Sequence, residues 1–147
     1  MADAKQKTAE PLPPEIWTLP GAVMTLDDGP HRGEQRLRGA KCKHCSTEFF
    51  PRQAVCPECW SEDIADNPLP SDGKLYAYAV VHVARKGWCT PYVIAYIDLA
   101  NGVRVSAPLK CDPKHPPPHD CAVRLEVGEI GRAEDGRPIM SHQFEAA

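Results

Sequence analysis

The sequence predicts a mainly β protein in which an N-terminal extension is followed by a rubredoxin-like zinc ribbon and a five-stranded barrel. Two Cys-x-x-Cys pairs separated by ten residues lie in the first half of the chain. The second half contains runs of aromatic and β-branched residues, which favour strands. Sixteen prolines in 147 residues disfavour long helices. We place the extension at 1–31, the ribbon at 32–70 and the barrel at 71–147.

The two cysteine pairs predict a closed zinc site. Its ligands are Cys42, Cys45, Cys56 and Cys59. Each pair can form a tight turn that directs two thiolates at one point, and four thiolates complete the tetrahedral shell that Zn²⁺ prefers. Such a shell leaves no position for a substrate, so the zinc is expected to be structural and His44 to point outward. A redox pair or disulfides are the alternative, which two pairs at this spacing disfavour.

Composition limits the class of protein. No apolar run approaches the ~20 residues that cross a bilayer, and residues 1–10 lack the apolar core of a secretory signal. The seven cysteines are an odd number, which suits a reducing cytoplasm. The net charge is -3 and neither half of the chain is strongly basic, which disfavours binding to a phosphate backbone. We expect a cytoplasmic protein without membrane association.

The extension has two parts. Residues 1–15 are polar and proline-rich, which predicts a disordered or loosely attached tail. Residues 16–24 are apolar but are broken by Pro20-Gly21, so they cannot form a long helix. An exposed tail does not need these apolar side chains. They are expected to pack either on the chain's own domain or on a partner subunit, and the sequence leaves both open.

Residues 32–43 form the one clearly basic stretch and lead directly into the first cysteine pair. This stretch is either a solvated strand face or a contact for a phosphorylated ligand or an acidic partner. Phe49 and Phe50 are expected to supply the apolar side of the ribbon. The polar, proline-containing segment 61–72 is interpreted as a linker.

Five strands are expected after this linker, at residues 74–86, 92–99, 103–109, 122–127 and 138–144. In the first strand, period-two alternation predicts one face made of Leu75, Ala77, Ala79, Val81 and Val83. Asn101-Gly102 predicts a tight hairpin, and the proline-rich segment 111–120 cannot be a central strand. A long, bent first strand and an extended connection after the third predict a Greek-key barrel of the OB type.

Several short stretches together carry a resemblance to a known family. They are Leu37-Arg38-Gly39, Phe50-Pro51-Arg52, Gly73-Lys74-Leu75, Val80-Val81-His82, residues 91–99 and Gly102, together with the two cysteine pairs. As a set they resemble the zinc-ribbon/OB-fold companion subunits of thiolase-like acyl-CoA enzymes, over about residues 33–146. Ser46 stands where that family usually has glycine. Segment 111–120 is richer in proline and histidine than the family pattern.

The resemblance implies a non-catalytic subunit. In such complexes the thiolase-fold partner supplies the cysteine and histidine chemistry, and the zinc-ribbon/OB protein shapes or covers the acyl-CoA site. The coenzyme A ester is then a ligand shared by the two subunits. Relatives serve thiolases, hydroxymethylglutaryl-CoA synthesis, acyltransferases and steroid side-chain aldolases. The specific expectation is a partner for a bulky aryl-acyl-CoA, such as benzoylsuccinyl-CoA in anaerobic aromatic degradation.

Five side chains are candidates for contact with CoA or with the partner subunit. They are Arg38, Arg52, Arg85, Lys86 and Trp88. An arginine can hold a phosphate through two parallel hydrogen bonds, and an indole can cover adenine or an acyl group. Taken singly, each of these side chains is more simply explained by a solvated or subunit-facing position.

Independent catalysis and nucleic-acid binding are the rival functions. A nucleophile needs a base within reach, and a strand rise of ~3.3 Å per residue keeps Cys89 far from His82. Cys111 has His115 and His119 nearby in sequence, but prolines surround them. An OB barrel that binds single strands needs a basic groove with exposed aromatic residues, whereas the barrel half is neutral. We expect no activity from the chain alone and keep OB-fold single-stranded nucleic-acid binding as the alternative.

Overall fold

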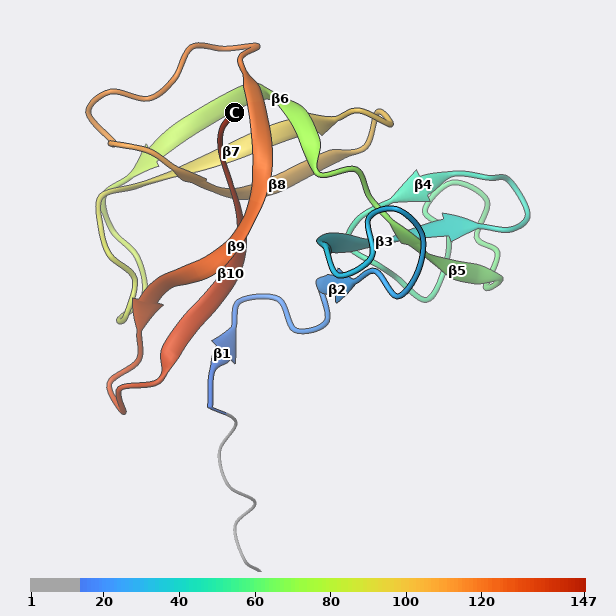
Figure 1. Ribbon diagram of the computed structural model, residues 1–147, viewed down its shortest axis with the longest axis horizontal. Helices are drawn as coiled ribbons and strands as arrows, with labels where there is room; N and C mark the ends of the chain where they lie inside the picture. The colour runs from blue at the N-terminus through green and yellow to red at the C-terminus, as the bar shows by residue number, and fades with distance from the viewer. Residues whose placement is uncertain (1–13) are drawn as a thin grey trace, which may run out of the picture.

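The computed structural model describes residues 14–147, which form strands, turns and loops without a helix. The strands are β1 (Ile16–Trp17), β2 (Val23–Thr25), β3 (Gln35–Cys42), β4 (Glu48–Phe49), β5 (Ile64–Pro68), β6 (Asp72–Val81), β7 (Tyr92–Leu99), β8 (Arg104–Lys110), β9 (Ala122–Arg132) and β10 (Pro138–Ala146). Figure 1 shows a small ribbon lobe built from β2 to β5 beside a larger barrel lobe built from β6 to β10. The prediction of a mainly β protein with a zinc ribbon and an OB barrel is confirmed.

The barrel is closed by five strands. Their order is β10-β8-β7-β6-β9, and β9 pairs back with β10. The contact between β10 and β8 is parallel, with Phe144 opposite Leu109, and the other pairings in the barrel are antiparallel. Closure leaves no open sheet edge along these strands.

Alternate residues of β7 build much of the barrel core. Val93, Ala95, Ile97 and Leu99 are buried, as the period-two pattern of this strand predicts. The predicted range 92–99 agrees with the observed Tyr92–Leu99. Phe144 of β10 is fully buried in the same cluster. The turn at Asn101-Gly102 joins β7 to β8 as predicted, with the glycine at φ 89°.

The first barrel strand differs from the expectation in which residues face the core. A register shift between Leu75 and Ala77 makes Tyr76 the extra residue of a β-bulge. Beyond the bulge, Tyr78 and Val80 pack against the core cluster. The predicted face of Ala77, Ala79, Val81 and Val83 is therefore wrong, because one added residue reverses the alternation. The strand also ends at Val81 and does not continue to residue 86.

The start of the described chain packs on its own barrel. Strand β1 pairs in parallel with β10, with Ile16 opposite Ile139, and the Thr18 hydroxyl donates a hydrogen bond to Ser141 Oγ at 2.9 Å. For residues 16–18 the structure thus selects the first of the two alternatives that the sequence left open. Of the predicted tail, residues 1–13 lie outside the described part of the chain.

The ribbon and the barrel share apolar contacts. Leu37 of β3 and Leu69, just after β5, are buried in the same cluster as the barrel core. Gly39 lies so close to Leu69 that a Cβ at this position would be 2.6 Å from Leu69 Cδ2. Phe50 meets His142 of β10 edge to face, with ring centroids 5.7 Å apart. The two lobes therefore share one continuous core.

Candidate functional site

The four cysteines of the two pairs come together in the ribbon lobe. Cys42 and Cys56 are fully buried. The sulfurs of Cys42 and Cys59 lie 3.5 Å apart, as do those of Cys45 and Cys56, and all four lie within 4.8 Å of one another. Four thiolates at about 2.3 Å from one Zn²⁺ would be about 3.8 Å apart. The cluster therefore fits a tetrahedral structural zinc, as predicted.

The two cysteine turns have the same backbone geometry. Each turn ends in a residue with a left-handed backbone, Ser46 at φ 64° and Trp60 at φ 65°. The Ser46 amide donates to the Cys42 carbonyl at 2.9 Å, and the Trp60 amide donates to the Cys56 carbonyl at 3.0 Å. Ser46 thus adopts the conformation that a glycine would adopt most easily, and the turn forms without one.

The four thiols do not lose their protons equally. Hydrogen bonding with the Thr47 hydroxyl, at 3.1 Å, and with the Thr47 backbone lowers the pKa of Cys45 to about 6. For Cys59, hydrogen bonding with the Ser61 backbone lowers the pKa, but desolvation and the neighbouring thiols outweigh this effect and raise the pKa to about 12. Sulfurs this close cannot all ionise without a cation between them. Zinc binding is therefore coupled to proton release.

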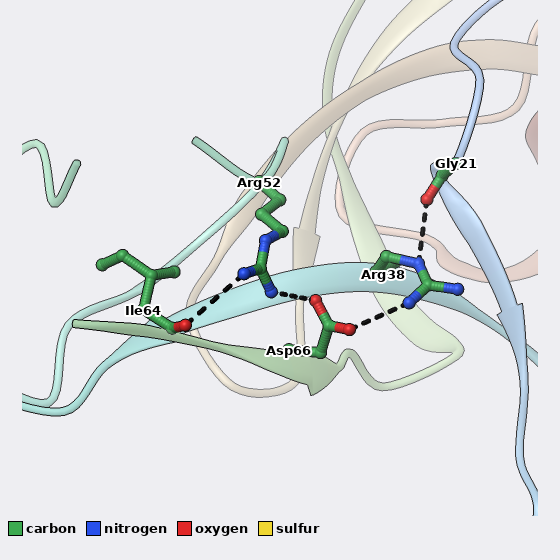
Figure 2. A network of polar contacts seen from close by, with 5 residues as sticks. All are labelled: Gly21, Arg38, Arg52, Ile64 and Asp66. Carbon is green, nitrogen blue, oxygen red and sulfur yellow. Dashed lines mark hydrogen bonds and ion pairs between the residues drawn. The ribbon is translucent and has the colours of Figure 1, made fainter. Parts of the chain in front are cut away.

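Arg38 and Arg52 meet at one carboxylate, Asp66 (Figure 2). Arg38 donates to Asp66 Oδ2 at 2.9 Å and to the Gly21 carbonyl at 3.1 Å. Arg52 donates to the other oxygen of Asp66 and to the Ile64 carbonyl at 3.4 Å. This network ties the segment before β2 to β3 and β5. Any contact of these arginines with CoA or a partner would use their remaining N–H groups.

The other three candidate residues lie on the loop between β6 and β7, so the structure divides the five candidates between the two lobes. Lys86 Nζ forms an ion pair with Glu134 at 2.7 Å. The guanidinium of Arg85 has no partner among residues 14–147, and this residue is exposed. The loop is held against β9, where Trp88 forms a bridge with Gly131 and the Arg132 amide donates to the Gly87 carbonyl at 3.0 Å.

A hollow of about 220 Å³ lies beside this loop. Trp88 and Tyr92 pair along it, with ring centroids 5.0 Å apart, and Lys110 and Cys111 line it from β8 and the following loop. Gln143 of β10 also lines the hollow; it is 7% exposed, and its side-chain amide makes no hydrogen bond within the described chain. A side-chain amide without a partner in the described chain is available to a polar group of a ligand. Gln143 was not predicted as a site residue, because no sequence pattern places it beside the loop that carries Trp88.

Three thiols lie outside the zinc site. In the described chain no hydrogen bond joins Cys89, Cys111 or Cys121 to a histidine. Burial, and then the charge of Asp112, raises the pKa of Cys111, and burial raises the pKa of Cys121. Thiolates, not thiols, are the reactive species.

Over residues 14–147, the four-cysteine cluster is the group that can hold a metal ion. No helix in this range is long and apolar enough to span a membrane.

Two family models match the chain in succession. Residues 31–65 match the rubredoxin-like zinc ribbon domain of ChsH2, and residues 66–128 match the ChsH2 C-terminal OB-fold domain. A benzoylsuccinyl-CoA thiolase subunit BbsA from Geobacter metallireducens is 32% identical over 97% of this chain and 94% of that protein. The subunit of the same name from Thauera aromatica is 37% identical over 74% of each chain.

Two further relatives extend the family. A DUF35 domain-containing scaffold protein from Methanocaldococcus jannaschii is 38% identical over 68% of this chain and 72% of that protein. In a solved structure described as an Ltp2-ChsH2(DUF35) aldolase, the similar chain has a TM-score of 0.61 and 26% identity, covering 76% of this chain and 84% of that chain. The chain therefore belongs to the ChsH2-type DUF35 family of proteins that join a rubredoxin-like zinc ribbon to an OB fold.

Proposed function

We propose that this chain is a non-catalytic subunit of a thiolase-type acyl-CoA enzyme, and that it shapes or covers the acyl-CoA site of a catalytic partner. The observation that carries the proposal is the 32% identity to a benzoylsuccinyl-CoA thiolase subunit over 97% of the chain. A match across both lobes supports a shared role for the whole chain, whereas a match to one lobe would support only a shared fold. The closed cysteine shell is then a structural element.

We assign the hollow beside Trp88 to the acyl-CoA ester. Its volume of about 220 Å³ lies below the ~300–1,000 Å³ of pockets that enclose a whole small molecule. It would therefore hold only one end of the ester, with the rest on the partner. The pair of Trp88 and Tyr92 suits a flat apolar group, which favours an aryl-acyl ester such as benzoylsuccinyl-CoA. The free amide of Gln143 would meet a carbonyl oxygen.

Cations beside the hollow would hold the phosphates. Arg85 has an unpaired guanidinium on the same loop as Trp88, and Lys86 is highly exposed despite its ion pair with Glu134. Arginine binds phosphate oxygens through parallel hydrogen bonds, which makes Arg85 the stronger candidate. We leave Arg38 and Arg52 as partner contacts, because Asp66 already engages both.

Single-stranded nucleic-acid binding has little support in the barrel's charges. Most of its cations are ion-paired: Lys86, Arg104, Lys110, Arg124, Arg132 and Arg137. The guanidinium of Arg104 also covers the ring of Tyr76 at 3.6 Å from its centroid, which removes one face of an exposed aromatic from stacking. A nucleic-acid groove needs free cations along exposed aromatic residues.

The test is reconstitution of the complex. The chain is purified with the thiolase-fold subunit that accompanies it in native cells, and acyl-CoA turnover is measured for each subunit alone and for the pair. Charge reversal at Arg85 and Lys86 should raise KM for the CoA ester and leave assembly unchanged. Reversal of Arg32 and Lys41, two exposed cations of the basic stretch 32–43, tests the ribbon lobe in the same way.

Two results would contradict the proposal. One is the absence of any thiolase-fold subunit together with oligonucleotide binding that weakens steeply with salt. The other is full activity of the catalytic subunit alone, with an unchanged KM when this chain is added. A rise in KM on reversal of Arg32 and Lys41 alone would contradict the assignment to Arg85 and Lys86 and move the phosphate contact to the ribbon lobe.

A further inference from the structure

Trp60 is the most exposed aromatic side chain of the described residues, at 80% exposure. Tyr76 and Tyr96 are about half exposed, and a tyrosine keeps its hydroxyl in water while Arg104 also covers the Tyr76 ring. The Trp60 indole has no hydrogen bond, ring contact or cation–π partner within residues 14–147. Tryptophan is strongly buried on average in folded proteins. Its place on this surface therefore has no explanation inside the chain.

The backbone at Trp60 does not require an indole. Trp60 and Ser46 occupy equivalent positions at the ends of the two cysteine turns, with φ 65° and 64°. Glycine adopts this region freely, and serine is a small substitute, whereas a bulky residue in it is uncommon and unfavourable. The hydrogen bond to the Cys56 carbonyl comes from the amide of residue 60, so a glycine would form it as well.

The cysteine turn holds the backbone that carries the indole. Trp60 directly follows the ligand Cys59, and its amide is bonded to the carbonyl of the ligand Cys56. The Cys56 amide in turn donates to the Ser61 carbonyl at 2.9 Å on the other side of Trp60. This backbone is already ordered before binding, so docking through Trp60 does not pay the cost of ordering a loop. Trp60 is thus a preorganised projection from the ribbon.

The surroundings of Trp60 are acidic. Residues 56–63 contain three carboxylates and no lysine or arginine. Glu58 and Glu62 are exposed and have no side-chain partner in the described chain, and the pair between Asp63 and Lys43 is loose at 3.9 Å. An indole flanked in sequence by the unpaired carboxylates of Glu58 and Glu62 complements an apolar pocket with a basic rim. The same carboxylates would repel the phosphates of a nucleic-acid backbone.

We propose that Trp60 anchors the ribbon to the catalytic subunit, with its indole in an apolar pocket of that subunit whose rim carries lysine or arginine. The inference rests on the proposed function and names where the partner docks. Interface hot spots are rich in tryptophan, which combines a large apolar area with few rotatable bonds. Glu58 and Glu62 would then steer the approach of the basic rim.

The test compares variants of the two equivalent turn positions in the full chain. The dissociation constant is measured against the purified thiolase-fold subunit for wild type, Trp60→Gly, Trp60→Phe and Ser46→Gly. We expect Trp60→Gly to weaken binding about 30-fold or more, and Trp60→Phe to restore part of it. Ser46→Gly relieves the same backbone conformation without removing an indole, so its affinity should stay at the wild-type value.

Folding and charge readouts accompany the affinities. Zinc content should stay at one ion per chain, and the melting temperature of Trp60→Gly should equal or exceed that of wild type, because glycine suits the left-handed backbone. Glu58→Lys with Glu62→Lys should slow association most at low salt.

The outcomes separate this inference from the proposed function. Wild-type affinity in Trp60→Gly would overturn the anchor while leaving the complex in place. A wild-type chain that binds no thiolase-fold subunit would overturn both. A homodimer of the isolated chain that is lost in Trp60→Gly would reassign the indole to self-association and also overturn the proposal.

Discussion

Phe50 of the ribbon and His142 of the barrel meet edge to face at 5.7 Å, and His142 Nε2 lies 3.2 Å from the Ser106 carbonyl. Burial lowers the pKa of His142 below its ordinary value of 6.5, although the Ser106 carbonyl opposes this shift. The folded protein thus holds a neutral imidazole at the contact between its two lobes. Protonation of His142 at low pH would place a charge at this contact.

The first prediction concerns pH and stability. A lowered folded pKa means that the unfolded chain binds more protons just below pH 6.5, so the free energy of unfolding should fall as the pH drops below 6.5 and level off below the folded pKa. The slope from this residue is at most about 1.4 kcal/mol per pH unit. Urea unfolding of wild type and His142→Gln between pH 8 and 5, both loaded with zinc, measures the difference. Equal slopes in the two proteins would contradict it.

Zinc removal should unfold the ribbon before the barrel. A chelator, or Cys56→Ser, removes the cation that holds four close sulfurs together, whereas the barrel strands pair among themselves. Amide exchange should then become fast in β3 and β5 and stay slow in β7, and binding to the partner should be lost. Cys89→Ser, which changes an exposed thiol outside the shell, should leave zinc content and exchange unchanged. Equal loss of protection in both lobes would argue against this order.

Zinc affinity should also fall as the pH is lowered. The thiols must lose their protons to bind the ion, and neighbouring sulfurs together with desolvation raise the pKa of Cys59 to about 12 despite the Ser61 backbone. Zinc titration at neutral pH should therefore release protons, which calorimetry in buffers of different ionisation enthalpy counts. Binding with no net proton release would show that all four sulfurs are already ionised.

Gly131→Ala should detach the loop that carries Trp88. A Cβ at this position would overlap the Gly87 carbonyl oxygen, whereas a Cβ on Gly128, in the same strand, would meet only the side-chain nitrogen of Gln143 at 3.2 Å. Backbone cannot yield as a side chain does, so we expect a loss of about 2–3 kcal/mol in unfolding free energy for Gly131→Ala and a smaller one for Gly128→Ala. Denaturant unfolding and Trp88 fluorescence provide the measurement. Similar losses in the two variants would refute the close approach.

Asp66→Asn should weaken the ribbon only modestly. Asp66 joins Arg38 and Arg52, but all three side chains are between 36% and 43% exposed, and exposed ion pairs contribute about 0.2–1 kcal/mol each. We expect a loss of about 1 kcal/mol in unfolding free energy, reduced by salt. A double-mutant cycle with Arg52→Gln isolates one pair. A coupling energy well above 1 kcal/mol would show that the network is more strongly desolvated than its exposure indicates.

Local patterns gave reliable predictions. The zinc ligands follow from two short motifs that each form one turn, and β7 follows from strict alternation ended by Asn101-Gly102. The faces of β6 could not be read in the same way, because the bulge at Tyr76 is set by pairing with β7 and leaves no mark on the alternation. Prediction of the ribbon and OB architecture required both the cysteine motifs and the number of expected strands.

Contacts between distant segments could not be predicted. Asp66 meets Arg38 because the register of β5 against β3 brings them close, and no periodicity encodes that register. Trp60 did leave a signal, a large aromatic residue where the turn geometry favours glycine, but its exposure is known only from the structure. Gln143 likewise becomes a candidate only once the hollow beside Trp88 is seen.

The parallel pairing of β1 with β10 has a consequence for how the nascent chain folds on the ribosome. Thr18 and Ser141, which hydrogen-bond across this region, are 123 residues apart, whereas Cys42 and Cys59 are only 17 residues apart. Contacts between distant residues form late, because the loop between them must close first. The ribbon can therefore capture zinc while β1 still lacks a partner. During synthesis the apolar strand β1 therefore remains unpaired until β10, the last of the described strands, has been made.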